Sequence, residues 1–257
     1  MVGRRFLGRG RTGDHRGVPH GHRRRCRRDA GSPGRSVGCG PAATAPVTAA
    51  LTAVRVLAVP ARLVVLASGA GTLLQALLDA QTDPGFPGEV VAVVSERADA
   101  QALVRAARHG VTAEVVPMAD FEDRGAWNRA LADTVAAHRP DLVVLAGFMK
   151  ILSPEFLRRF QGRIINTHPG LLPAYPGAHA VRDALEAGAS ITGASVLWVD
   201  EGVDTGAAIA QTEVPVLVGD DESSLHERIK VVEREMLVHV VSELLTPPRA
   251  SAPGFRA

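Results

Sequence analysis

The sequence is poor in cysteine, in aromatic residues and in long apolar runs, and each shortage excludes a class of protein. Its two cysteines, Cys26 and Cys39, both precede residue 41, so the rest of the chain can hold neither a disulfide framework nor a thiolate metal site. Only 4% of the residues are aromatic, so a core must be built from Val, Leu, Ile and Ala. No apolar run reaches the roughly 18 residues of a membrane span. We therefore expect a cytoplasmic protein without a bound metal or a membrane anchor.

Charge is distributed unevenly along the chain. The first 40 residues contain eleven Arg and two Asp, a net charge of +9, so residues 41–257 carry −7 of the formal total of +2. The basic part is rich in Gly and Pro and has little apolar periodicity, which predicts a disordered extension over residues 1–60. Sequence rich in Arg, Gly and Pro is also what GC-rich DNA encodes upstream of a true start codon, so the native chain could begin within residues 47–60. Nucleic-acid binding would require this extension and is otherwise not expected.

From residue 61 onward, short apolar runs alternate with helical patterns. We predict strands at 62–67, 90–94, 113–116 and 142–146, and helices at 73–80, 98–109 and 123–138. A strand that ends at 165, a helix at 177–187, an antiparallel pair at 194–199 and 207–214, and a long helix at 221–245 follow. This order predicts one α/β domain over residues 61–245, a Rossmann-like, mostly parallel sheet with helices on both faces, and a flexible tail at 246–257.

Two polar side chains stand where the predicted strand 163–165 ends. Asn166 and His168 are two positions apart, so on an extended chain they leave on the same face. An amide and an imidazole directed at one point can hold a carbonyl oxygen and move a proton, and Asp204 from a later loop could favour the imidazolium form. The alternative is that His168 is an ordinary hydrogen-bonded structural histidine.

The turn Gly69-Ala-Gly-Thr72 links a predicted strand to a predicted helix. Glycines allow a ligand to approach the backbone, and a helix N-terminus offers free N–H groups to an anion. The turn is neither a G-x-G-x-x-G fingerprint nor a Walker loop, and an ordinary strand-to-helix turn would look the same.

Five segments together resemble the folate-dependent phosphoribosylglycinamide formyltransferases of the formyltransferase family. They are 67–75, 143–152, Asn166-Thr-His-Pro169, 171–179 and 200–206, in the order of the family. The resemblance implies a seven-stranded sheet and transfer of a formyl group from the co-substrate 10-formyltetrahydrofolate to the amine of phosphoribosylglycinamide. It further implies small-molecule partners, a monomer or a homodimer, and no metal.

The resemblance also implies roles for individual residues. The catalytic group is Asn166, His168 and Asp204. The acceptor side is Gly71, Thr72, Leu73, Lys230 and Glu233, and the folate side is Arg124, Met149, Lys150, Ile151, Leu152, Asn166, Val199 and Asp200. From the residues alone, Lys230 and Glu233 fit a surface ion pair on one helix face better than a binding site, and residues such as Met149, Ile151 and Leu152 usually belong to a core. Leu73 stands where many relatives have Asn, which removes one side-chain donor from the turn.

Three other functions fit parts of the sequence. A 10-formyltetrahydrofolate hydrolase shares the three catalytic residues, but residues 1–60 do not resemble its amino-terminal ligand-binding module. A methionyl-tRNA formyltransferase needs a carboxy-terminal RNA-binding barrel, for which the residues after Leu245 are too few. A non-catalytic nucleotide-binding module would not need Asn166, His168 and Asp204 together.

Overall fold

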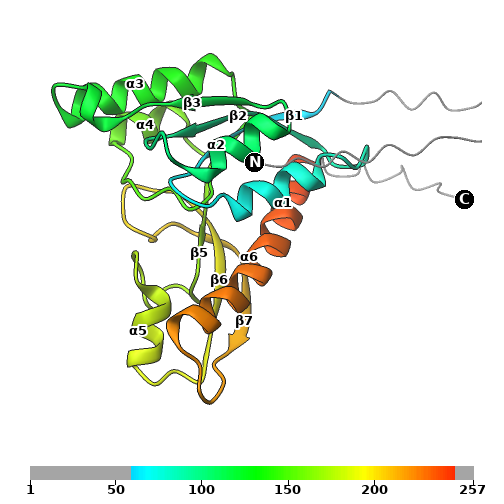
Figure 1. The fold of residues 1–257 in the computed structure, drawn as a ribbon, viewed down its shortest axis with the longest axis vertical. Coiled ribbons are helices and arrows are strands. Elements are labelled where there is room, and N and C mark those ends of the chain that lie inside the picture. Colours follow the sequence, from blue (N-terminus) through cyan, green and yellow to red (C-terminus); the bar gives the residue numbers. More distant parts are fainter. Residues whose placement is uncertain (1–58, 247–257) are drawn as a thin grey trace, which may run out of the picture. The chain divides into compact units, whose positions relative to one another are not determined.

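The computed structural model describes residues 59–246, and the predicted extension and tail lie almost wholly outside that range. One seven-stranded sheet organises this unit, in the order β3-β2-β1-β4-β5-β6-β7 (Figure 1). The strands are β1 (Ala61–Leu66), β2 (Gly88–Ser95), β3 (Thr112–Val115), β4 (Leu142–Leu145), β5 (Ile164–His168), β6 (Ile191–Trp198) and β7 (Ala208–Pro215). The pairs from β3 to β5 are parallel, whereas β5–β6 and β6–β7 are antiparallel. The predicted α/β class is confirmed.

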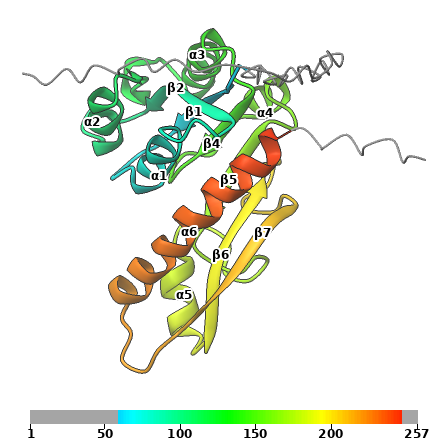
Figure 2. The same ribbon diagram turned by 90° about the vertical axis from the view of Figure 1, so that its right-hand side faces the viewer.

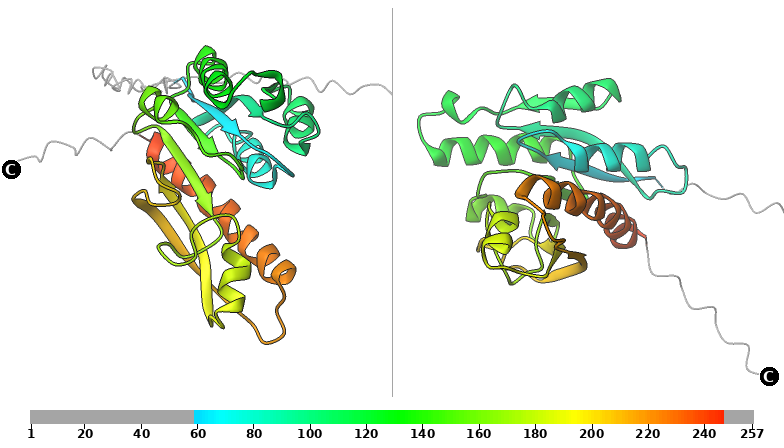
Figure 3. Two further views of the ribbon diagram at one scale, coloured as in Figure 1. Left: turned by 90° about the vertical axis from the view of Figure 1, so that its left-hand side faces the viewer. Right: turned by 60° about the horizontal axis from the view of Figure 1, so that its bottom comes forward.

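Helices connect the strands and cover the sheet. They are α1 (Thr72–Ala80), α2 (Gln101–Arg108), a 3-10 turn η1 (Met118–Asp120), α3 (Arg124–Ala137), α4 (Pro154–Arg159), α5 (Ala180–Glu186) and α6 (Glu222–Leu245). Helix α6 runs beside β6 and β7 and reaches α1 with its second half (Figure 2). Helices α3 and α5 lie at opposite ends of the unit (Figure 3).

The alternation along β1 shows why two cores form. Leu63 and Val65 face one side and pack with α1, α2 and α6, whereas Val64 and Leu66 face the other and pack with α3 and α4. All four side chains are fully buried. A strand buried on both faces must be apolar at every position, and the continuous apolar runs of the sequence therefore identify the central parallel strands.

Several predicted element bounds were wrong. Helix α2 begins at Gln101, three residues after the predicted start, and α4 was not predicted at all. Ser153 accepts a hydrogen bond from the N–H of Phe156, and Pro154 occupies the first turn of α4, a start signal that the sequence does contain. The predicted helix 177–187 is shorter at both ends. It begins only at Ala180, because Gly177 has a φ of 94° that a helix does not allow, and it ends at Glu186.

Candidate active site

A cavity of about 610 Å3 opens where β1, β4 and β5 end and α6 passes in front of them. This is the carboxyl edge of the parallel strands, where open α/β sheets bind their ligands. All but one of the predicted site residues line it. The lining includes Gly71, Thr72, Leu73, Met149, Lys150, Ile151, Leu152, Asn166, His168, Val199, Asp200, Asp204, Lys230 and Glu233.

Strand β5 positions the amide and the imidazole from within the sheet. It continues to His168 instead of ending at Ile165 as predicted, because β6 pairs with it antiparallel and places Leu197 opposite Asn166 and Ser195 opposite His168. The alternation of the strand sends both side chains to one face, as the spacing predicted. His168 is only 3% exposed, so its position is fixed by packing as well as by pairing.

Both ring nitrogens of His168 face oxygen atoms that accept hydrogen bonds. Nε2 lies 2.9 Å from the carbonyl oxygen of Tyr175, and Nδ1 lies 3.3 Å from Oδ2 of Asp204. A carbonyl and a carboxylate can only accept hydrogen bonds, so each nitrogen of the ring faces an acceptor at the floor of the cavity, and one of these acceptors is the carboxylate of Asp204.

Three groups outside its own loop contact the carboxylate of Asp204. Asn166 Nδ2 donates to its Oδ1 at 3.2 Å, the N–H of Gly177 donates to its Oδ2 at 2.8 Å, and His168 faces it. The hydrogen bond with His168, followed by those from Gly177 and Asn166, holds the pKa of Asp204 below its ordinary value against the opposing effect of burial. Its backbone φ of 55° is unusual for a residue with a side chain and shows that the loop imposes this position.

The loop itself depends on Asp200, which the resemblance assigns to the folate side. Oδ1 of Asp200 accepts from the N–H of Gly202 at 3.0 Å and from the hydroxyl of Thr205 at 2.7 Å. These bonds bracket Asp204 and fold the segment between β6 and β7 back on itself. One oxygen of Asp200 is thus used to shape the loop, and the side chain also lines the cavity.

The glycine turn approaches a neighbouring helix very closely. Gly71 has a φ of 69°, and a Cβ built on it would lie 2.8 Å from Cα of Ala102. Helix α1 then starts at Thr72, with its first N–H groups at the cavity. Leu73, the second residue of α1, is only 8% exposed and packs in the core. The turn therefore offers an anion its backbone N–H groups and the hydroxyl of Thr72, but no side-chain donor from Leu73.

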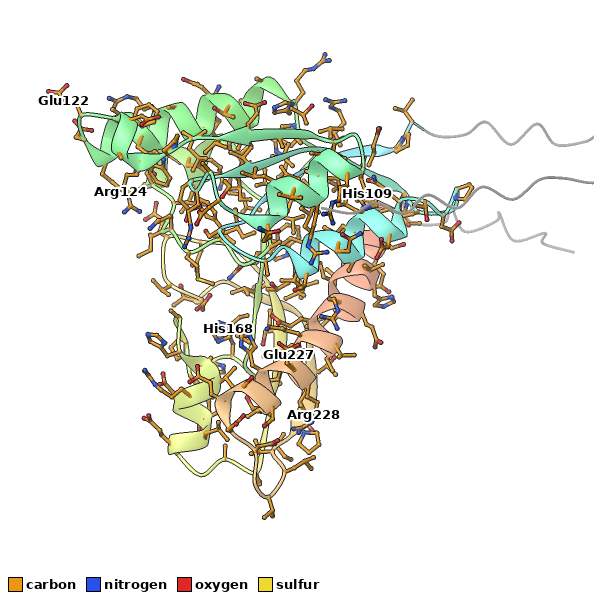
Figure 4. All side chains as sticks on the ribbon, in the orientation of Figure 1. His109, Glu122, Arg124, His168, Glu227 and Arg228 are labelled. Carbon is orange, nitrogen blue, oxygen red and sulfur yellow. The ribbon has the colours of Figure 1, made fainter. Side chains whose placement is uncertain are left out.

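Helix α6 contributes two charged groups with different surroundings. Lys230 is 29% exposed and pairs with Glu227 at 2.8 Å, so the ion pair with Glu233 that the spacing allowed is not the one that forms. Glu233 is 4% exposed and faces the cavity, where burial raises its pKa to about 7 against the lowering effect of His168 and Lys230. Figure 4 shows His168 lying near α6.

The folate-side segment forms the mouth of the cavity. Met149 and Ile151 are 66% and 65% exposed, whereas Leu152 is buried in the core with α3 and α4. The core alternative is therefore correct for Leu152 alone. Arg124 is the one predicted residue that does not line the cavity: it lies apart from His168 (Figure 4), and its Nη2 donates to the carbonyl of Ile151 at 2.7 Å.

Some cavity residues were missed by the sequence reading. His226 lines the cavity at the same face of α6 as Lys230 and Glu233, with spacings of four and three that place all three on one stripe. Burial lowers the pKa of His226, with Lys230 acting in the same direction. The carbonyl of Tyr175 and the N–H of Gly177 also take part, through hydrogen bonds to His168 and Asp204, and neither residue was among the predicted site residues.

Within residues 59–246, no cluster of three or more His, Cys, Asp or Glu side chains is arranged to bind a metal ion. Over the same residues, no helix has the length and hydropathy that a membrane crossing requires.

Comparison with known proteins identifies the family. The formyl transferase family pattern matches residues 61–241. The phosphoribosylglycinamide formyltransferase of Mycobacterium tuberculosis (strain H37Rv) is 56% identical over 187 residues, which cover 73% of this chain and 86% of that protein.

Two further relatives extend the comparison. The trifunctional purine biosynthetic protein adenosine-3 of Drosophila melanogaster is 47% identical over 174 residues, 67% of this chain and 13% of that protein. The crystal structure of glycinamide ribonucleotide transformylase 1 from Symbiobacterium toebii matches with a TM-score of 0.71 and 43% identity, covering 72% of this chain and 88% of that one. The fold, the matched range and the shared sequence lead to one conclusion: this chain belongs to the formyl transferase family.

Proposed function

We propose that this chain transfers a formyl group from 10-formyltetrahydrofolate to the amine of 5-phosphoribosylglycinamide, a step of purine biosynthesis. The names of its relatives support this acceptor and this pathway. The observation that carries the proposal is the convergence of Asn166, His168 and Asp204 on one cavity at the carboxyl edge of the sheet. Cytoplasmic location, a monomer or homodimer, and the absence of a metal remain predictions from the sequence.

The reaction makes and breaks one bond to the same carbon atom. The acceptor amine attacks the formyl carbon, the carbonyl oxygen becomes an oxyanion, and the bond from that carbon to N10 of the folate then breaks. The amine loses a proton and N10 gains one, so the products are the formylated acceptor and tetrahydrofolate. A site for this reaction must stabilise a transient negative oxygen next to a transient positive nitrogen.

The three polar residues meet these needs without a covalent intermediate on the protein. The amide of Asn166 can donate to the oxyanion, and the buried imidazole of His168 lies two positions further along the same face of β5. Asp204 faces His168, and its hydrogen bonds lower its pKa and so favour its ionised form. Charges fixed before the substrate arrives cost no reorganisation during the reaction, which is why such groups can be so effective.

The acceptor fits the side of the cavity formed by the glycine turn and α6. A phosphate can bind at the start of α1, where Gly71 and Thr72 line the cavity. Lys230 supplies a positive charge, and Glu233 a carboxyl group that can accept a hydrogen bond from the amine. Because its pKa is about 7, Glu233 can also take up a proton at neutral pH.

The donor fits the mouth of the cavity. A pterin is flat and largely apolar, and the exposed side chains of Met149 and Ile151 offer it apolar surface next to Val199. Arg124 supports this side by holding the carbonyl of Ile151.

The test is a folate absorbance assay on the full chain, with and without phosphoribosylglycinamide. Loss of the 10-formyl donor that requires both the acceptor and His168 would support the transferase. Donor loss without acceptor would instead indicate a hydrolase. Folded protein that turns over the donor in neither case would contradict both enzymes and favour a binding role.

A further inference from the structure

The acceptor side and the donor side of the cavity meet at a single buried serine. Ser68 is the residue directly before Gly69, where β1 passes into the glycine turn, and it is 5% exposed. Its Oγ accepts the N–H of Met149 at 2.8 Å, and its own N–H donates to the carbonyl of Gly147 at 3.2 Å. The start of the turn and the start of the folate-side segment are thus joined by two hydrogen bonds.

A buried carboxylate completes this contact. The hydroxyl of Ser68 donates to Oε2 of Glu96 at 2.9 Å, and Glu96, at the end of β2, is 8% exposed. A hydroxyl has one proton, so donating it to Glu96 turns the remaining lone pairs toward other donors such as the N–H of Met149. Glu96 therefore orients the hydroxyl of Ser68 so that its lone pairs can accept the hydrogen bond from the N–H of Met149.

The segment that Ser68 holds is anchored in the core on either side of its exposed residues. Met149 and Ile151 are mostly exposed, whereas their neighbours Phe148 and Leu152 are buried in the core with α3 and α4. Arg124 holds the carbonyl of Ile151 at 2.7 Å, in the middle of the segment. The hydrogen bond to Ser68 ties the exposed Met149 directly to the residue that precedes the glycine turn.

We infer that Ser68 and Glu96 are positioning residues that set the donor-binding segment in register with the acceptor-binding turn. This inference rests on the proposed function and assigns the pair a part in donor binding. Neither residue lines the cavity, so both act through Met149 and not by touching the substrates. Removing the hydroxyl leaves a buried carboxylate without its donor and frees Met149, so the donor site loses its shape more than the acceptor site does.

Steady-state kinetics on the full chain test the inference. Ser68→Ala should raise the KM for 10-formyltetrahydrofolate about tenfold, a typical effect of one buried hydrogen bond, while the KM for the acceptor and kcat change less than about threefold. Ser95→Ala is the matched control, since Ser95 is the last residue of β2, directly before Glu96, is fully buried, and its Oγ accepts the N–H of Arg97 at 3.1 Å. It should leave the donor KM unchanged.

Substitutions of Glu96 test the same link if Ser68→Ala does not fold. Glu96→Gln keeps an oxygen that can accept from Ser68 and should resemble the wild type, whereas Glu96→Ala should raise the donor KM about threefold. Equal donor KM values for the two Glu96 variants would overturn the inference. So would a Ser68→Ala variant whose two KM values rise together, or whose donor KM matches that of Ser95→Ala.

A direct binding measurement separates this inference from the proposed function. If the wild type shows no acceptor-dependent transfer, the proposed function fails, and the affinity for tetrahydrofolate is then compared between the wild type and Ser68→Ala by calorimetry. Weaker binding to the variant would uphold the positioning role. Equal affinities, or no binding to the wild type, would overturn it.

Discussion

The two walls of the cavity are built in opposite ways. On the sheet wall, Asn166, His168 and Asp204 are joined to one another and to nearby backbone by hydrogen bonds and an ion pair. On the helix wall, Lys230 is partly exposed and pairs only with an exposed glutamate, and Glu233 is buried with a strongly raised pKa. The sheet wall is complete without a ligand, whereas the helix wall holds groups whose charges are poorly compensated.

This difference assigns different tasks to the two walls. Groups that stabilise a transition state work best when they are fixed in advance, and the sheet wall has that property. Groups that bind a charged substrate can instead be compensated by the substrate itself, which makes binding favourable. We expect changes on the sheet wall to reduce kcat and changes on the helix wall to raise the KM for the acceptor.

The largest effect is expected for His168→Ala. Loss of the buried imidazole should lower kcat roughly a thousandfold, within the range found for acid–base and charge-stabilising groups, with a smaller change in either KM. His239→Ala is a suitable control because His239 is 70% exposed on α6 and pairs with the similarly exposed Glu243. If His168→Ala instead mainly raised the acceptor KM, His168 would belong to substrate binding, and the division of tasks between the two walls would be wrong.

Asp204→Asn should have the second largest effect. The substitution keeps the size of the side chain but removes the charge that faces His168, so kcat should fall on the order of a hundredfold. Asp133→Asn, at an exposed ion pair with Arg159, provides the control. Full activity of Asp204→Asn would show that the ionised carboxylate does not contribute to catalysis.

Glu233→Gln should separate binding from stability. The pKa of Glu233 is about 7, above its ordinary 4.5, so the folded state binds the proton more tightly than the unfolded state. As pH rises from 4.5 through 7 the wild type therefore loses stability at this site, and Gln removes that loss. Denaturant unfolding at pH 8 should find the variant more stable by up to about 3 kcal/mol, with the difference gone near pH 4.5.

The same variant should bind the acceptor less well. Its KM for phosphoribosylglycinamide should rise about tenfold, because an amide cannot supply a carboxylate to the amine. A variant that gained no stability at pH 8 would show that Glu233 is compensated in the free protein, and the contrast between the walls would disappear.

The smallest effects are expected at the exposed ion pair of α6. Lys230→Gln should raise the acceptor KM about tenfold and leave stability nearly unchanged, since partly exposed ion pairs contribute little. Glu227→Gln should change neither quantity, which makes it the matched control. Kinetics that vary the acceptor at saturating donor measure the acceptor KM of each variant, and denaturant unfolding measures its stability. An equal rise in KM for the two variants would mean that the pair acts as a unit.

Much of the fold could be predicted because burial leaves a direct trace in the sequence. The runs in β1 and β4 are apolar at every position, and only a strand covered on both sides requires that. The end of β5 could not be predicted, because its last residues are polar and are held by pairing with β6, which lies more than twenty residues later. Local sequence cannot report such a partner.

The site shows the same limit. Asn166 and His168 could be paired from their spacing, but the contact of Asp204 with both depends on the antiparallel pair β6–β7 and on a left-handed backbone at Asp204. The partner of Lys230 could not be chosen between Glu227 and Glu233, because both are three positions away on the helix. Burial decides between them, and it follows from the packing of α6 on the sheet.

The most direct test of the account follows the formyl group itself. Full-length protein is incubated with isotopically labelled 10-formyltetrahydrofolate and phosphoribosylglycinamide, and the products are separated and analysed by mass spectrometry. We expect the label to appear on the acceptor amine, and we expect His168→Ala to abolish its appearance. Label recovered as free formate, at a rate that does not depend on the acceptor, would contradict the proposed transfer.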